Sequence, residues 1–200
     1  INIIINLKNF HVICSSEMII DKIKNKKKIW HYGPYKKNFY EFLLRYGNKL
    51  STSSSIVKKN FLFSKKILFS EKKKFSNVED YDFFLNISRQ NGIFYFSKKI
   101  HGKHLFHSES STLKRKKINE ALFSVIKHHV NLQIFTKDKE KLLSEINVYY
   151  KVKKFLENIY SKKSITSLIK LIFIFFSKPF IVLRMLSKIV ENQKNVIRVN

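Results

Sequence analysis

Hydrophobic and polar residues follow two different patterns along this 200-residue chain, and the change comes near residue 112. Before that point, short alternating or β-branched runs are interspersed with helical stripes, which is typical of a mixed α/β domain. The predicted strands are residues 10–15, 49–57 and 93–96, and the predicted helices are residues 39–46 and 77–91. After residue 112 only the helical period remains.

Glycines and charge runs separate these elements. Gly47 follows residues 39–46 at the position that glycine favours after a helix, and Gly92 ends the next helix in the same way. Residues 22–28 are rich in lysine and predict an exposed loop. Residues 61–75 mix aromatic residues with lysines without a clear period, and they predict a loop with a short helix.

The region after residue 112 predicts helices only. Apolar residues recur at helical spacing from Ile118 to Val130 and from Leu142 to Ile159. Residues 164–190 are strongly apolar, but basic residues and Pro179 interrupt them before they reach the roughly 18 uncharged residues of a spanning helix. We expect two short helices in the membrane interface, the second beginning at Pro179. A buried helical pair and a true membrane span are the alternatives.

Composition changes this picture only in part. The formal net charge of +26 would suggest nucleic acid or an anionic membrane surface as a partner. However, Lys, Ile, Asn, Phe and Ser dominate the chain, as expected when A and T dominate the codons. Two explanations of the positive charge stay open. This codon bias has spread lysines over solvated faces, or the charge has been selected for binding. Cys14 is the only cysteine, so no internal disulfide can form, which fits a reducing compartment.

Candidate chemistry is concentrated in residues 76–112, SNVEDYDFFLNISRQNGIFYFSKKIHGKHLFHSESST. Glu79 and Asp80 stand in the first turn of a predicted helix, where the helix dipole favours a carboxylate. A rigidly held carboxylate can take the proton from a hydroxyl as that hydroxyl attacks a substrate. The structural alternative is a capping box, with Asn77 as the N-cap and Asp80 reaching back to it.

The succession of a hydroxyl-rich strand, a Phe-rich loop, a Glu-Asp helix, a Gly, an aromatic strand and a His-x-x-Ser loop resembles family 2 glycosyltransferases. The resemblance covers about residues 14–112 and the C-terminal part of their catalytic domain. It implies an α/β, partial GT-A-like fold that lacks its N-terminal half and is followed by α-helices. The expected division is 1–112 for this half domain, 113–163 for a helical extension, 164–190 for membrane-interface helices and 191–200 for a tail.

The activity implied by the resemblance is inverting transfer of a sugar from a nucleotide-sugar donor to a saccharide or lipid-linked acceptor. Such reactions serve surface polysaccharide synthesis at the cytoplasmic, inner face of the cell membrane. Asp80 would be the catalytic base, with Glu79 as its partner in the pair. Apart from Asp80-Tyr81-Asp82 at the start of the predicted helix, the chain has no Asp-x-Asp pair, so the main ligands of an expected divalent metal, Mg²⁺ or Mn²⁺, would lie outside it. We therefore expect the fragment alone to be inactive.

Further site residues follow from the same resemblance. His107 would be a metal ligand with Ser110 as its companion hydroxyl, although the arginine that relatives often place two residues earlier is Leu105 here. An ordinary loop histidine is the alternative. Ser53 and Ser54 would line the substrate site or form a polar sheet edge. Trp30 would stack on a sugar or pack in the core.

A rival hypothesis is a basic, non-catalytic nucleic-acid-binding protein, such as a ribosome-associated one. Many aromatic residues follow core periodicity and no recognition motif is evident, which makes nucleic acid the less favoured partner. A degraded gene is the third alternative.

Overall fold

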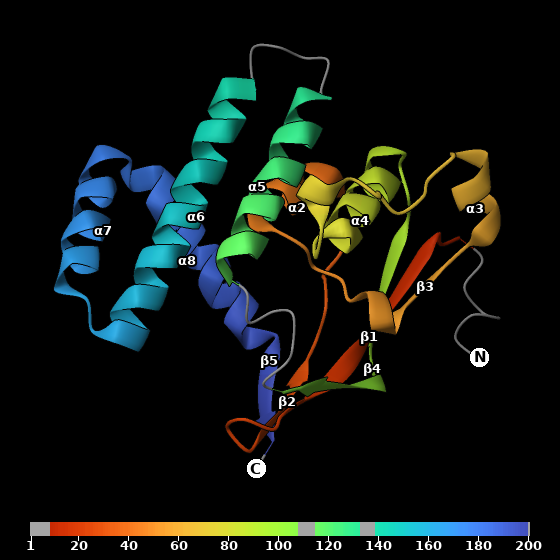
Figure 1. The fold of residues 1–200 in the computed structure, drawn as a ribbon, viewed down its shortest axis with the longest axis horizontal. Helices are drawn as coiled ribbons and strands as arrows, with labels where there is room; N and C mark the ends of the chain where they lie inside the picture. Colours follow the sequence, from red (N-terminus) through yellow and green to blue (C-terminus); the bar gives the residue numbers. More distant parts are fainter. Residues whose placement is uncertain (1–8, 108–114, 133–138, 200) are drawn as a thin grey trace.

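The computed structural model describes residues 9–107, 115–132 and 139–199. The chain folds as a mixed α/β protein in which one five-stranded sheet is joined to a group of helices (Figure 1). The strands are β1 (Val12–Asp21), β2 (Lys26–Trp30), β3 (Ser55–Val57), β4 (Phe94–Phe106) and β5 (Val196–Val199). The α-helices are α2 (Phe39–Tyr46), α3 (Lys59–Ser64), α4 (Glu79–Arg89), α5 (Arg115–Asn131), α6 (Lys139–Lys162), α7 (Ile165–Ser177) and α8 (Pro179–Lys194), with short 3₁₀ helices η1 (Thr52–Ser54) and η2 (Lys73–Phe75).

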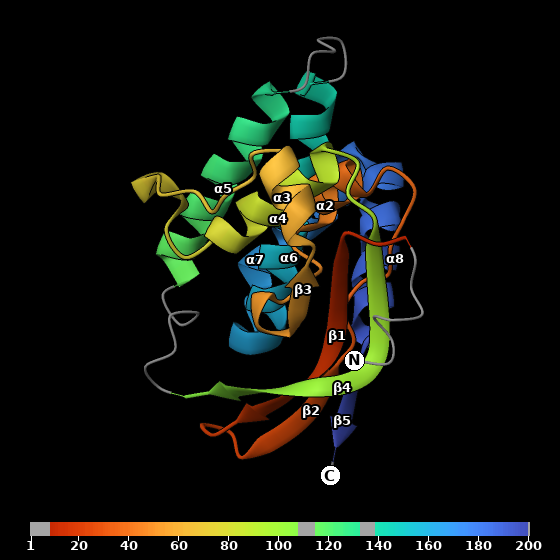
Figure 2. The same ribbon diagram turned by 90° about the vertical axis from the view of Figure 1, so that its right-hand side faces the viewer.

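The sheet is built around β1. On one edge, β1 pairs in parallel with β4 along its whole length, and Figure 2 shows the two curving together. On the other edge, β3 pairs antiparallel with residues 12–14 and β2 with residues 17–21. A strand has only two edges, so β3 and β2 must follow one another along the same edge. They leave Ser15 and Ser16 without a strand partner there, and this gap becomes part of the candidate site.

Two hydrophobic clusters hold the helices. The larger one joins β1 and β4 to α2, α4, α5 and α6, with Leu43, Phe84 and Val125 fully buried. The predicted helical extension therefore completes the core of the α/β part. In the smaller cluster, α7 and α8 pack on α6 around Val152 and Val182. No helix in the described ranges is long and apolar enough to cross a membrane.

The predicted helices are confirmed. Residues 39–46 form α2, and the Gly47 N–H donates to the Leu43 carbonyl (2.8 Å) just past its end. The stripe after Asn77 forms α4, and the two helical periods after residue 112 form α5 and α6. Helix α8 begins at Pro179, where the sequence predicts it.

The strands differ more from prediction. Strand β1 extends far beyond residues 10–15 and β4 far beyond residues 93–96, because the two strands support each other through continuous pairing. Of residues 49–57, only the last three are strand, and the hydroxyl run before them forms η1. Sequence-local propensity cannot show where a partner strand will be.

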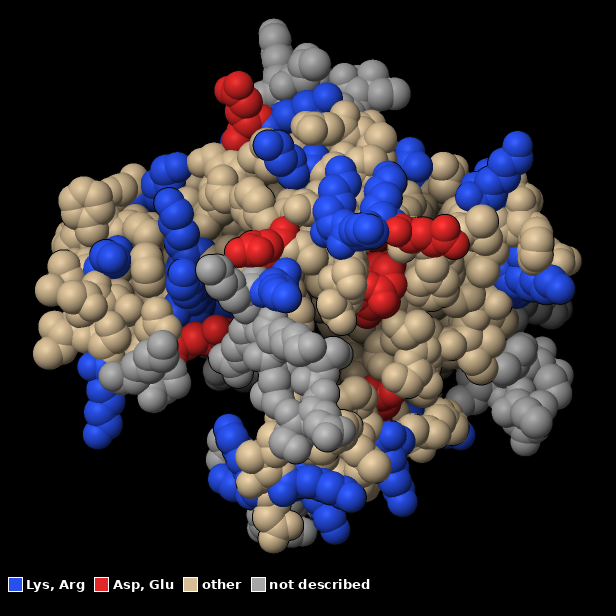
Figure 3. Space-filling view, in the orientation of Figure 1, with Lys and Arg blue, Asp and Glu red and all other residues tan. Residues whose placement is uncertain are grey.

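Two segments that were not predicted as strands join the sheet, one of them rich in lysine and the other at the C-terminal end. Residues 22–28, predicted as a loop, form a turn and then the start of β2. Residues 191–200, expected as a tail, contain the end of α8 and β5, which pairs with β2 through Trp30 and Val196. Figure 3 shows basic side chains gathered at the lower end of the molecule, where Figure 1 places β2, β4 and β5. Tertiary pairing overrides weak strand propensity in both segments.

Gly33 is required by a close approach to β4. Its φ is +82°, and a Cβ there would lie 2.5 Å from Cγ of Phe96. Gly47 has a similar φ of +79°, but its Cβ would meet only the Tyr150 hydroxyl at 3.5 Å. We expect Gly33→Ala to lower the free energy of unfolding by about 2–3 kcal/mol, from backbone strain plus overpacking. Gly47→Ala should cost about 1 kcal/mol, from strain alone. Equal losses in urea unfolding would contradict the role of Phe96.

Candidate functional site

Asp80 is fixed in the first turn of α4. Its Oδ1 accepts from the Tyr81 N–H (2.7 Å), and its Oδ2 accepts from Nδ2 of Asn48 (3.2 Å), which lies just after α2. The N-cap residue is Val78, and no side-chain cap bond is formed there by the described residues. The capping-box alternative is therefore wrong, and the Asp80 side chain is oriented by α2 and by its own helix.

Burial raises the pKa of Asp80, and the neighbouring Glu79 charge adds to this effect. The Tyr81 N–H and the Thr52 hydroxyl act in the opposite direction by stabilising the carboxylate. Beside it, Oε2 of Glu79 is buried and has no hydrogen-bond partner among the residues that the structure describes. A buried acceptor without a partner is costly, so a donor group that reached Oε2 of Glu79 would stabilise it.

The hydroxyl run forms the wall next to Asp80. Thr52 and Ser53 are exposed, and the Ser53 hydroxyl lies 3.5 Å from that of Ser51. Ser54 turns toward β1, where its Oγ lies 3.6 Å from Sγ of Cys14. Of the two serines predicted to bind substrate, Ser53 is therefore the exposed one, and Ser54 contacts the sheet.

The hydroxyl run is held on its sheet side by a buried carboxylate, Glu17 of β1. Glu17 stands in the middle of β1, is 1% exposed, and accepts from the Tyr32 hydroxyl (2.6 Å) and the Ser51 hydroxyl (3.1 Å). In the gap between β3 and β2, Ser16 Oγ lies 2.7 Å from Nδ1 of His31. Sequence reasoning missed Glu17, although an acid inside the apolar run ICSSEMII was a usable signal.

Trp30 stands directly opposite Glu17 in the β1–β2 ladder. Its ring is 40% exposed and stacks on Tyr32, with centroids 6.3 Å apart and planes 12° apart. Lys28 Nζ lies 5.0 Å from the centroid of the Trp30 ring. The structure thus connects Trp30, through Tyr32, Glu17 and the hydroxyl run, to Asp80.

His107 follows β4 directly at its far end. Gly102 of β4 pairs with Glu17, so His107 lies five residues further along, roughly 16 Å in extended chain. His107 is exposed, and Ser110 lies outside the described residues. Across residues 9–107, 115–132 and 139–199, no three His, Cys, Asp or Glu side chains are grouped to hold a metal ion. The roles of His107 and Ser110 stay predictions.

The Tyr32–Glu17 hydrogen bond offers a direct test of this arrangement. Tyr32→Phe removes a bond to a buried carboxylate, so we expect the free energy of unfolding to fall by about 1.5–3 kcal/mol. Tyr35→Phe is the matched control, because Tyr35 is 46% exposed and should change stability by under about 0.5 kcal/mol. Denaturant unfolding measures both. A neutral Tyr32→Phe would mean that Glu17 is hydrated and not organised by Tyr32.

Comparisons of the chain with protein-family models, with curated proteins and with solved structures found no match. The resemblance to family 2 glycosyltransferases therefore rests on the residues of this chain alone.

Proposed function

We propose that the chain is part of an inverting glycosyltransferase with a GT-A-like fold, whose donor-binding N-terminal half lies outside these residues. It would move a sugar from a nucleotide-sugar donor to a saccharide or lipid-linked acceptor in surface polysaccharide synthesis. One observation carries this proposal: Asp80 is held by Asn48 and Tyr81 at the start of α4, beside the exposed hydroxyl of Thr52.

The chemistry requires one base from this chain. As the acceptor oxygen attacks the anomeric carbon, Asp80 takes its proton and the new glycosidic C–O bond forms. The bond to the nucleoside diphosphate breaks, and the leaving group departs with the electron pair. The raised pKa makes the ionised Asp80 a stronger base than an ordinary carboxylate. Trp30 and Tyr32 offer stacked rings for the apolar face of a sugar.

The proposed family implies Mg²⁺ or Mn²⁺ on the donor diphosphate. In this chain His107 is the one residue assigned to such an ion, and a single imidazole does not make a site. The described residues supply no cluster around it. The described residues therefore do not by themselves form a site for such an ion. We place the complete enzyme in the cytoplasm, at the inner face of the cell membrane.

The decisive experiment measures release of nucleoside diphosphate by the complete protein from a panel of nucleotide sugars, with and without lipid-linked and free saccharide acceptors. We expect acceptor-dependent release and a product of inverted anomeric configuration by NMR. The 200-residue chain alone should release none. Absence of acceptor-dependent release, together with RNA binding that weakens steeply with salt, would replace the proposal by the nucleic-acid-binding alternative.

A further inference from the structure

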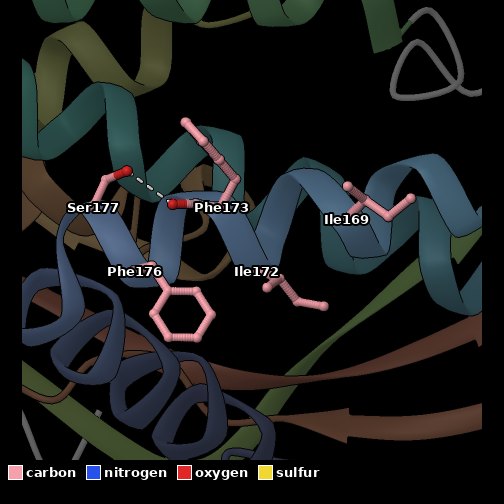
Figure 4. Close-up of a pocket in the computed structure, with 5 residues that line it drawn as sticks. All are labelled: Ile169, Ile172, Phe173, Phe176 and Ser177. Carbon is pink, nitrogen blue, oxygen red and sulfur yellow. Dashed lines mark hydrogen bonds between the residues drawn. The ribbon is translucent and has the colours of Figure 1, made fainter.

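An apolar ridge runs along the outer side of α7 and onto the start of α8. We define it by six exposed side chains: Ile165, Ile169, Ile172, Phe173, Phe176 and Phe180. Three of them are rings with exposed fractions of 75%, 78% and 86%. Figure 4 shows the α7 part, where Ile172 and Phe176 project from the same side of the helix. So much exposed aromatic surface in one place marks an interaction site.

The opposite side of α7 is already occupied. Leu171, Ile174 and Phe175 pack against the cluster formed with α6 and α8. The helix is therefore attached to the body of the protein by one face, and the ridge is its outward face. In Figure 3 the corresponding end of the molecule, on the left, is mostly uncharged surface.

The charge around the ridge identifies what covers it. Residues 158–190 contain no Asp or Glu, but they contain six Lys and Arg residues. Lys163 and Lys170 are exposed, and Lys170 lies one turn before Phe173 on the helix surface. A second copy of this chain would bring basic residues against basic residues. An anionic surface with an apolar interior has the complementary chemistry.

Length then fixes the geometry. Helix α7 has 13 residues, so it is about 20 Å long, less than the roughly 30 Å of a bilayer core. It can lie in the plane of the interface with its rings among the acyl chains and its lysines at the headgroups. We propose that the apolar ridge binds anionic phospholipid membranes. This contact rests on the membrane location proposed above and not on the transfer chemistry.

Vesicle flotation of the 200-residue chain, without donor or acceptor, tests the proposal. We expect the chain to float with vesicles of phosphatidylcholine and phosphatidylglycerol and to bind pure phosphatidylcholine much more weakly. Phe173→Ser/Phe176→Ser should weaken binding at least about tenfold, because two rings no longer enter the apolar layer. Phe63→Ser/Leu68→Ser is the matched control, since both side chains are exposed in and after α3, at the other end of the molecule (Figure 1).

The charge component is tested separately. Lys163→Glu/Lys170→Glu should lower affinity for the anionic vesicles at least about thirtyfold and leave binding to phosphatidylcholine unchanged. Failure of the wild-type chain to bind anionic vesicles, or equal loss in the α3 control, would overturn the proposal. So would dimerisation that Phe173→Ser/Phe176→Ser abolishes, without vesicle binding. Circular dichroism melting confirms that each variant is folded. Nucleoside diphosphate release by the complete protein tells a failed membrane contact from a failed transferase.

Discussion

Asp80→Asn in the complete enzyme is expected to lower the rate of sugar transfer by about a hundred- to ten-thousandfold. The amide has nearly the same shape, and its oxygen can still accept from the Tyr81 N–H, so the start of α4 should stay in place. What is lost is the ability to take a proton from the acceptor hydroxyl. Donor binding, measured by calorimetry, should therefore stay nearly unchanged while product formation falls.

Glu71→Gln is the matched control for this experiment, because Glu71 is an exposed acid in the loop before the same helix. It should leave transfer unchanged. If Asp80→Asn also retains its turnover, Asp80 is not the base. Loss of donor binding together with turnover would instead indicate that the substitution has disturbed the site.

The pH dependence gives Asp80 a second signature. Burial raises the pKa of Asp80, so the carboxyl group takes up its proton at a higher pH than an exposed aspartate does. As the pH is lowered, the transfer rate should therefore start to fall at a higher pH than it would if the base were an ordinary exposed carboxyl group. The direction follows because the proton-accepting form is the ionised one.

The difference between Leu43 and Glu17 shows how far the sequence alone could predict this protein. Leu43 and its neighbours in α2 form a stripe at helical spacing, so both the helix and its buried face could be predicted from local pattern. The role of Glu17 as a buried acceptor depends on tertiary contacts, because Tyr32 after β2 and Ser51 in the hydroxyl run are its hydrogen-bond donors. No local pattern contains those distances.

The lengths of the strands, like the role of Glu17, depend on tertiary contacts that no local pattern contains. The β1–β4 pairing joins residues about 80 positions apart, as in Val12 with Phe94, and it carries both strands well past their apolar cores. The pairing of β5 with β2 likewise depends on α8 ending next to Trp30. For the candidate site, Asp80 and Ser53 could be selected from sequence, whereas Asn48, the residue that holds Asp80, could not.

A buried network between helices supplies the other large expected effect. Oδ1 of Asp82 in α4 lies 2.9 Å from Nε2 of His129 in α5, and both side chains are nearly inaccessible. The Tyr40 hydroxyl of α2 lies 3.1 Å from Nδ1 of the same imidazole. Nδ2 of Asn86 donates to the second Asp82 oxygen (3.2 Å). Three helices are thus joined through His129, and its partner Asp82 lies two residues along α4 from Asp80.

Asp82→Ala should lower the free energy of unfolding by about 3–5 kcal/mol, because it leaves the buried His129 ring without its carboxylate partner. Glu71→Ala is the control. Because Glu71 is exposed, its substitution should change the free energy of unfolding by less than about 0.5 kcal/mol. Urea unfolding of the 200-residue chain measures both.

The double variant Asp82→Leu/His129→Leu separates the cost of an orphaned partner from the cost of losing the pair. Replacing both members of a buried polar pair by apolar residues is often nearly neutral, so the double variant should recover most of the loss seen in Asp82→Ala. A small loss for Asp82→Ala, below about 1 kcal/mol, would mean that water reaches the imidazole. A double variant as unstable as the single one would mean that the network fixes the packing of α4 on α5 through its geometry, which leucines cannot reproduce.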